Sequence, residues 1–166
     1  FLITSRDFVI KGFKNLSQNL AHFGFSLLIL SILLNNFFST ELITNLRIGE
    51  TFQNEKIQIN FESVSKEKIQ NYNAIVGKFN IQNSKGDIEV LEPELRIYNQ
   101  PNIVTSEADI KTNLLSDKFM TMNLVQNQEY FNIRYQIKPF MIWIWFSVII
   151  ISFGGLFSFF KKKHEN

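Results

Sequence analysis

Two long apolar blocks lie near the ends of the chain, and the charged residues lie between and outside them. No residue from Asn15 to Thr40 is charged, and none from Pro139 to Phe160 is charged either. A helix needs about 20 mostly apolar residues to cross the hydrocarbon core of a bilayer, and both blocks reach that length. The pattern therefore predicts two transmembrane helices and favours them over two buried helices of a soluble protein.

Basic residues flank both blocks. Arg6, Lys11 and Lys14 precede the first block, and Lys161–Lys163 directly follow the second. Lysine and arginine beside the end of a span mark the side that stays in the cytoplasm or the mitochondrial matrix. Two crossings bring both ends of the chain to that same side, so the segment between the spans is predicted to lie in the periplasm or the intermembrane space.

The segment between the spans has the pattern of a β-rich domain. Lys56–Val64 and Tyr130–Ile137 alternate apolar and polar residues, as half-buried strands do. Lys78–Ile81 and Ile88–Leu91 flank the glycine-containing turn Asn83–Asp87, which predicts a hairpin. The pattern favours a small β module, either a barrel or a sandwich.

One stretch of this segment lacks the alternation. Thr105–Ser116 is predicted to be helical or irregular, with a short helix starting at Ser106-Glu107. The predicted fold class is thus an integral membrane protein with two transmembrane helices that enclose a β-rich extracytoplasmic domain. Its predicted segments are a cytoplasmic or matrix-side flank (1–15), a transmembrane helix (16–40), the β-rich domain (41–138), a second transmembrane helix (139–160) and a basic tail (161–166).

Composition narrows the chemistry. The 166 residues include no cysteine, so the chain forms no disulfide and no thiolate site. The β-rich segment contains no histidine, and its basic residues are scattered, which argues against a hydrolase triad and against nucleic-acid binding. The chain starts with Phe1, which suggests the tail of a longer or split protein. Abundant Phe, Ile, Asn and Lys suggest an AT-rich genome, either mitochondrial or that of a reduced bacterium. With the predicted topology, the membrane is then a mitochondrial inner membrane or a bacterial plasma membrane.

His22 is the one ionisable residue inside an apolar block. On a helix, Gln18, His22 and Ser26 share one face, and Ala21 and Gly24 are small enough to admit another helix nearby. An ionisable residue in a span is by default a candidate functional residue. A neutral imidazole there can ligate haem iron, relay a proton, or hydrogen-bond a neighbouring helix; if the span starts near Ala21, it is only an interface residue.

Several motifs occur in an order that resembles a known family. They are Ala21-His22-x-Gly24, LRIGETF (Leu46–Phe52), PELRIY (Pro93–Tyr98), SEADI (Ser106–Ile110), Asp117, and Lys138-Pro139-Phe140 followed by Trp143-Ile144-Trp145. Together they resemble the C-terminal part of CcmF, the haem lyase subunit of cytochrome c maturation. The resemblance covers nearly the whole chain. One departure is Ile142, where the family usually has an arginine.

The resemblance implies a membrane assembly that attaches haem covalently to the Cys-x-x-Cys-His motif of apocytochromes c. It implies that His22 is an axial ligand to the iron of a haem b, with the second ligand in the upstream part of the same protein. The implied partners are apocytochrome c, its thiol-reducing chaperone subunits and a haem-delivery protein. No catalytic residue is assigned, and the fragment alone is not expected to be active.

Two other interpretations remain open. In one, the spans are a two-pass anchor for a β-rich domain that docks a partner, with no haem of its own. In the other, the chain belongs to a paralogous lyase dedicated to a multihaem reductase.

Overall fold

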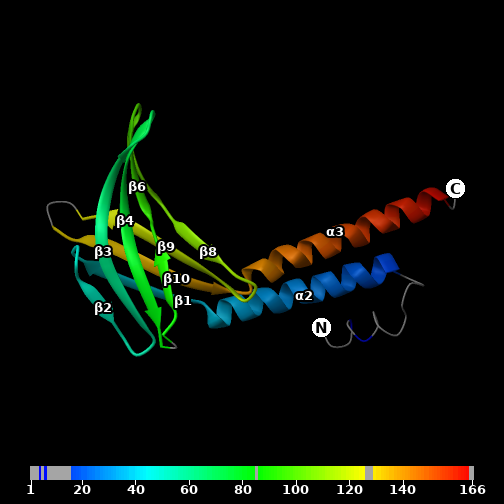
Figure 1. Ribbon diagram of the computed structural model, residues 1–166. Helices are drawn as coiled ribbons and strands as arrows, with labels where there is room; N and C mark the ends of the chain where they lie inside the picture. The colour runs from blue at the N-terminus through cyan, green and yellow to red at the C-terminus, as the bar shows by residue number, and fades with distance from the viewer. Residues whose placement is uncertain (1–3, 5, 7–15, 85, 126–128, 165–166) are drawn as a thin grey trace. The chain divides into compact units, whose positions relative to one another are not determined.

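The computed structural model describes residues 4, 6, 16–84, 86–125 and 129–164 of the chain (Figure 1). Among them are two long helices, α2 (Leu16–Phe38) and α3 (Met141–His164), with the strands between them in sequence. The chain divides into two compact units, one with the helices and the turn 113–117, the other with the remaining residues of the strands. The predicted class, two long apolar helices flanking a β-rich domain, is confirmed.

The strands form two antiparallel sheets. Their bounds are β1 (Thr40–Leu46), β2 (Thr51–Gln53), β3 (Ile57–Lys68), β4 (Tyr72–Asn83), β5 (Ile88–Leu91), β6 (Glu94–Asn99), β7 (Asn102–Glu107), β8 (Asp109–Thr112), β9 (Ser116–Leu124) and β10 (Phe131–Pro139). One sheet has the order β1-β10-β9-β8, and the other has the order β2-β3-β4-β6-β7, with β5 also paired to β4. The last strand, β10, thus lies between the first strand and β9.

The core is formed by side chains from both sheets. Phe61 of β3 stacks on Phe79 of β4 with ring centroids 4.3 Å apart, and it meets Phe131 of the other sheet edge to face at 5.4 Å. The buried core residues are Leu46, Ile59, Phe61, Phe79, Ile81, Leu91, Leu95, Met120, Met122, Ile133 and Tyr135. Because each sheet contributes the alternate residues of its strands, the domain is a sandwich.

Polar contacts also join the two sheets. The Ser106 hydroxyl donates to the carbonyl oxygen of Met122 at 2.8 Å, and Lys118 of β9 forms an ion pair with Glu89 of β5. Burial, with a smaller contribution from the Glu89 carboxylate, raises the pKa of Tyr135 to about 12. The Tyr135 side chain therefore stays neutral inside the sandwich at ordinary pH.

The strand predictions were largely confirmed, and the helix expected at Ser106-Glu107 was wrong. Lys56–Val64 falls on β3, and the predicted hairpin is formed by β4 and β5, which pair from Phe79↔Leu91 to Gln82↔Ile88. The supposed helical stretch is strand in β7 and β8. Most of its side chains are exposed, so no apolar alternation marks it, and its conformation comes from cross-strand pairing with β6 and β9.

The two helices pack against each other through small residues. A Cβ added at Gly154 would lie 2.9 Å from the backbone nitrogen of Ala21 and 2.9 Å from the carbonyl oxygen of Ser17. A Cβ at Gly24 would lie 2.8 Å from the side chain of Ile151. The backbones approach this closely only because glycine has no side chain, as is common where membrane helices meet.

Candidate functional site

His22 lies on the face of α2 that points away from α3. Gly24 is buried against α3, and a residue two positions earlier on a helix is rotated about 160° from it. His22 is accordingly exposed, together with Gln18 one turn before it and Phe25 and Ile29 after it. The polar stripe predicted from the sequence therefore forms in part, on a surface that α3 does not cover.

The imidazole of His22 has no polar partner among the residues that the structure describes. The Ser26 hydroxyl donates at 2.8 Å to the carbonyl oxygen of His22, so it satisfies the helix backbone and not the ring. Serine hydroxyls inside helices commonly bond in this way. A ring nitrogen of His22 is therefore available to a ligand or to a side chain from another segment.

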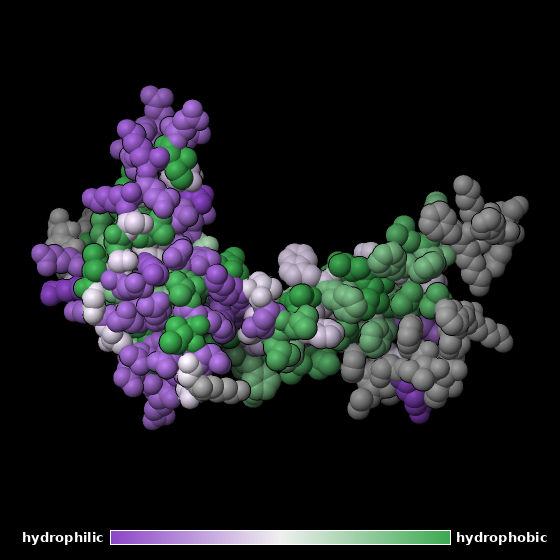
Figure 2. Space-filling model, viewed as in Figure 1, coloured by the Kyte–Doolittle hydropathy of each residue, from purple (hydrophilic) through white to green (hydrophobic). Residues whose placement is uncertain are grey.

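His22 lies within the apolar length of α2, nearer the start of the helix at Leu16 than its end at Phe38. Both α2 (Leu16–Phe38) and the Met141–Phe159 part of α3 are long and apolar enough to cross a membrane. His22 lies 16 residues before Phe38, which corresponds to about 24 Å along the helix axis. Figure 2 shows hydrophobic side chains over both helices and mainly hydrophilic ones over the strands.

His22 is the only histidine of α2, so this helix offers one imidazole to a metal. The described residues contain no group of three or more His, Cys, Asp or Glu side chains arranged to bind a metal ion. The other histidine, His164, is the last residue of α3, at the far end of the chain. His22 can thus supply one ligand to an iron atom, and any other ligand must come from another segment.

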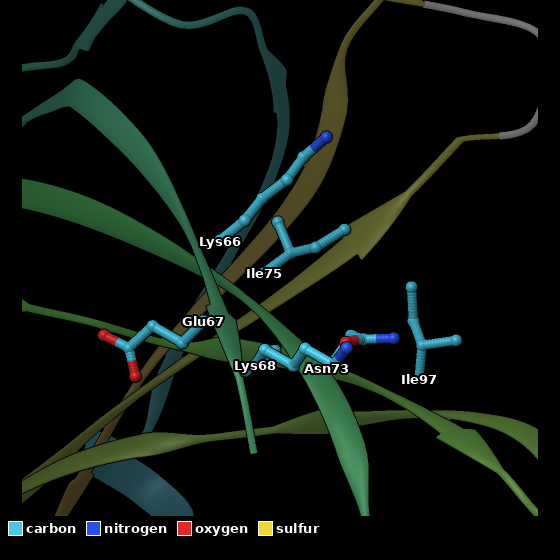
Figure 3. A pocket seen from close by; sticks show the side chains of 7 residues that line it. Lys66, Glu67, Lys68, Asn73, Ile75 and Ile97 are labelled. Carbon is cyan, nitrogen blue, oxygen red and sulfur yellow. The ribbon is translucent and has the colours of Figure 1, made fainter. Parts of the chain in front are cut away.

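The β domain has a shallow groove of about 320 Å³ at one end of the larger sheet (Figure 3). Lys66 pairs with Ile75 and Lys68 pairs with Asn73, and Ile97 lies on the next strand. Because cross-strand partners share a face, these residues form one surface with two lysines beside two isoleucines. Glu67 also lines the groove, so the groove combines charged and apolar side chains that can contact a partner.

The tryptophans identified in the sequence lie at the start of α3, and one makes a contact that the sequence did not predict. The indole Nε1 of Trp143 donates to the carbonyl oxygen of Leu114 at 2.9 Å. Leu114 belongs to the turn between β8 and β9, 29 residues earlier in the chain. Only the pairing of β8 and β9, which the sequence did not reveal, brings the turn to this position.

The fold and the surface of α2 define a class of protein: a β-sandwich inserted between two candidate membrane helices, one of which presents a histidine on its free face. Residues 37–139 match the family model described as the CcmF C-terminal beta-sandwich. The chain belongs to the CcmF family of cytochrome c biogenesis proteins.

Relatives match along nearly the whole chain. The chain is 29% identical over 169 residues to a protein of Haemophilus influenzae called cytochrome c-type biogenesis protein CcmF, with 98% of the chain and 26% of that protein covered. It is 25% identical over 162 residues to the CcmF of Pseudomonas fluorescens, with 95% and 24% covered. The NrfE protein of Haemophilus influenzae is 26% identical over 149 residues, with 88% and 23% covered.

A solved structure shares the fold. The protein named cytochrome c heme lyase CcmF superposes with a TM-score of 0.66 at 18% identity, covering 92% of this chain and 26% of that chain. The chain therefore spans about a quarter of the length of the curated relatives it matches. The predicted resemblance to CcmF is confirmed.

Proposed function

We propose that this chain is the haem-binding C-terminal part of a cytochrome c haem lyase, in which His22 is an axial ligand to the iron of a haem b. The observation that carries the proposal is the placement of His22 on the face of α2 that α3 leaves free. An unpaired imidazole on an apolar helix face is costly in lipid unless another group binds it. The names of the relatives supply the context of cytochrome c maturation.

The residues around His22 fit a porphyrin edge. Phe25 and Ile29 are exposed on the same side of α2, and their apolar side chains would exclude water from the iron ligand. Small residues on the opposite face let α3 pack closely behind α2 and support it. A second ligand and the other walls of the site would come from the upstream part of the protein. A haem b bound there would supply a one-electron carrier.

The substrate reaction follows from the family. It would attach haem to the Cys-x-x-Cys-His motif of apocytochrome c through addition of thiols to the haem vinyl groups. Those thiols would belong to the substrate, which agrees with the absence of cysteine from this chain, and thiol-reducing partner subunits would keep them reduced. The basic flanks of the two apolar blocks favour an inner membrane location with the β-sandwich on the periplasmic or intermembrane-space side.

The test is the absorbance of the assembled, membrane-bound complex. His22→Ala should abolish or shift the low-spin haem b bands in the reduced-minus-oxidised spectrum and lower the yield of holocytochrome c. His164→Ala removes the only other histidine of this chain and is the matched control, with an unchanged spectrum. An unaltered spectrum and undiminished cytochrome c yield in His22→Ala would refute the ligand assignment.

The groove of Figure 3 supports a second candidate, a two-pass anchor that presents a partner-docking domain. Its lysines and isoleucines suit a protein segment with both acidic and apolar side chains. In that case His22→Ala would leave both the spectrum and partner binding unchanged, whereas Lys66→Glu with Lys68→Glu would weaken partner binding.

A further inference from the structure

The turn between β8 and β9 presents two leucines to the surroundings. Leu114 is 71% exposed and Leu115 is 66% exposed. Turns that face water are usually built from polar residues, so two adjacent large apolar side chains at a tip need a reason. The turn belongs to the same compact unit as α2 and α3.

Hydrogen bonds fix the turn to the start of α3. The indole of Trp143 donates to the carbonyl oxygen of Leu114 at 2.9 Å, and the backbone N–H of Phe140 donates to the carbonyl oxygen of Leu115 at 2.8 Å. The two leucines therefore lie at the level of the first turn of α3. The exposed side chains of α3 nearby are apolar: Ile142, Trp143, Trp145 and Phe146.

Several backbone groups of the turn have hydrogen-bond partners. The Asn113 side-chain oxygen accepts from the N–H groups of Leu115, at 2.9 Å, and Ser116, at 2.8 Å. The N–H of Asn113 donates to the carbonyl oxygen of Ser116 at 3.1 Å. An irregular segment enters the apolar part of a bilayer only if its backbone polar groups have partners. At this tip the carbonyl oxygens of both leucines and the N–H groups of three residues are paired.

We propose that Leu114 and Leu115 insert into the outer leaflet of the bilayer at the level of Trp143, so that the β8–β9 turn is a third, non-spanning membrane contact. The partner is the acyl-chain and headgroup boundary of a lipid bilayer. The apolar surface of the turn continues that of α3, and tryptophan at the start of a span favours this boundary. The inference rests on the proposed membrane crossing of α3.

The absence of cysteine makes a site-specific test possible. A nitroxide label is attached to the cysteine of Leu114→Cys, and the chain is reconstituted in phosphatidylcholine vesicles. The collision rates of the label with oxygen, which concentrates in lipid, and with a water-soluble nickel chelate are then measured. Leu124→Cys is the matched water control. This leucine is 55% exposed and is the last residue of β9, the strand that starts just after the turn. Phe153→Cys, 52% exposed in the middle of α3, is the lipid control.

The label at position 114 should show an oxygen-to-nickel collision ratio severalfold above that at 124 and near that at 153. A water-like ratio at 114 with a lipid-like ratio at 153 overturns the insertion and leaves the spanning assignment intact. An immobile label at 114 shielded from both reagents also overturns it, because protein then covers the turn. Water-like ratios at both 114 and 153 contradict the membrane crossing of α3 itself.

Discussion

At the scale of single residues, the sequence predicted that His22 is a candidate functional residue but not the direction in which its side chain points. Ala21 and Gly24 were expected to admit another helix, and the structure places α3 against them. Gln18 and His22 lie on a second face of the same predicted helix, and a neighbouring helix could equally have covered that face. Gly154 decides between the two faces, because its missing side chain lets α3 lie against the backbone of Ala21. The contact of Gly154 with Ala21, from a distant part of the chain, is not visible in either helix alone.

Tyr135 gives the domain a defined sensitivity to alkali. Its pKa rises from 10.0 to about 12 on folding, chiefly through burial and then through the Glu89 carboxylate. Below about pH 10 the side chain is neutral in both states, so its contribution to stability is fully present. Between about pH 10 and 12 the unfolded chain ionises first, and stability should fall.

Urea unfolding of the wild type and of Tyr135→Phe at successive pH values measures this contribution. The wild type should lose more stability than the variant as the pH rises through that window. Parallel curves for the two proteins would show that Tyr135 does not cause the loss.

At the scale of elements, the strands with one buried face were predictable and those with two exposed faces were not. Ile59 and Phe61 alternate with polar residues in β3, which made that strand evident. Most side chains of β7 and β8 are exposed, so their conformation depends on pairing with distant strands. The pairing of β8 with β9 also sets the position of Leu114, so the contact of Leu114 with Trp143 could not be predicted from the sequence.

The packing of α2 on α3 makes opposite predictions for two adjacent glycines. A Cβ at Gly154 meets backbone atoms of α2 at 2.9 Å, whereas a Cβ at Gly155 meets nothing within 4 Å. Gly154→Ala should therefore separate the helices and cost about 1–3 kcal/mol, as overpacking usually does. Gly155→Ala should be neutral or stabilise the helix by up to about 1 kcal/mol.

Chemical unfolding of the two variants in detergent, followed by circular dichroism, measures the difference. Gly154→Ala should unfold at a lower denaturant concentration than the wild type, and Gly155→Ala should not. Equal stability of the two variants would contradict the close approach at Gly154.

At the scale of the whole molecule, the order of the main parts was predictable because long apolar blocks and strand alternation are local signals. The choice of a sandwich over a barrel was not, since it depends on β10 entering the first sheet between β1 and β9. The pairing of β1 with β10 joins Thr40 to Ile137 and Leu46 to Phe131. No local pattern encodes a contact over that length of chain.

The topology proposed for the two spans predicts from which side of the membrane a single introduced cysteine can react. The reaction is measured in intact cells, or in organelles from which the outer membrane has been removed. Glu55→Cys, in the exposed turn between β2 and β3, should react with a membrane-impermeant maleimide added from outside. Asn166→Cys, the C-terminal residue, should react only after the membrane is permeabilised. Reaction of both positions from the same side would contradict the single crossing, by α3, that separates them.

The central place of β10 in its sheet also sets the order of events during synthesis. The ribosome makes β1 before the other strands of its sheet, yet its hydrogen-bonding partner appears only at Phe131–Pro139, directly before α3. Until then the facing edges of β1 and β9 lack the strand that joins them, and exposed strand edges invite pairing with other chains. Closure through such distant contacts is slow. The first sheet can therefore close only after β10 has been synthesised, and until then its open strand edges can pair with other chains.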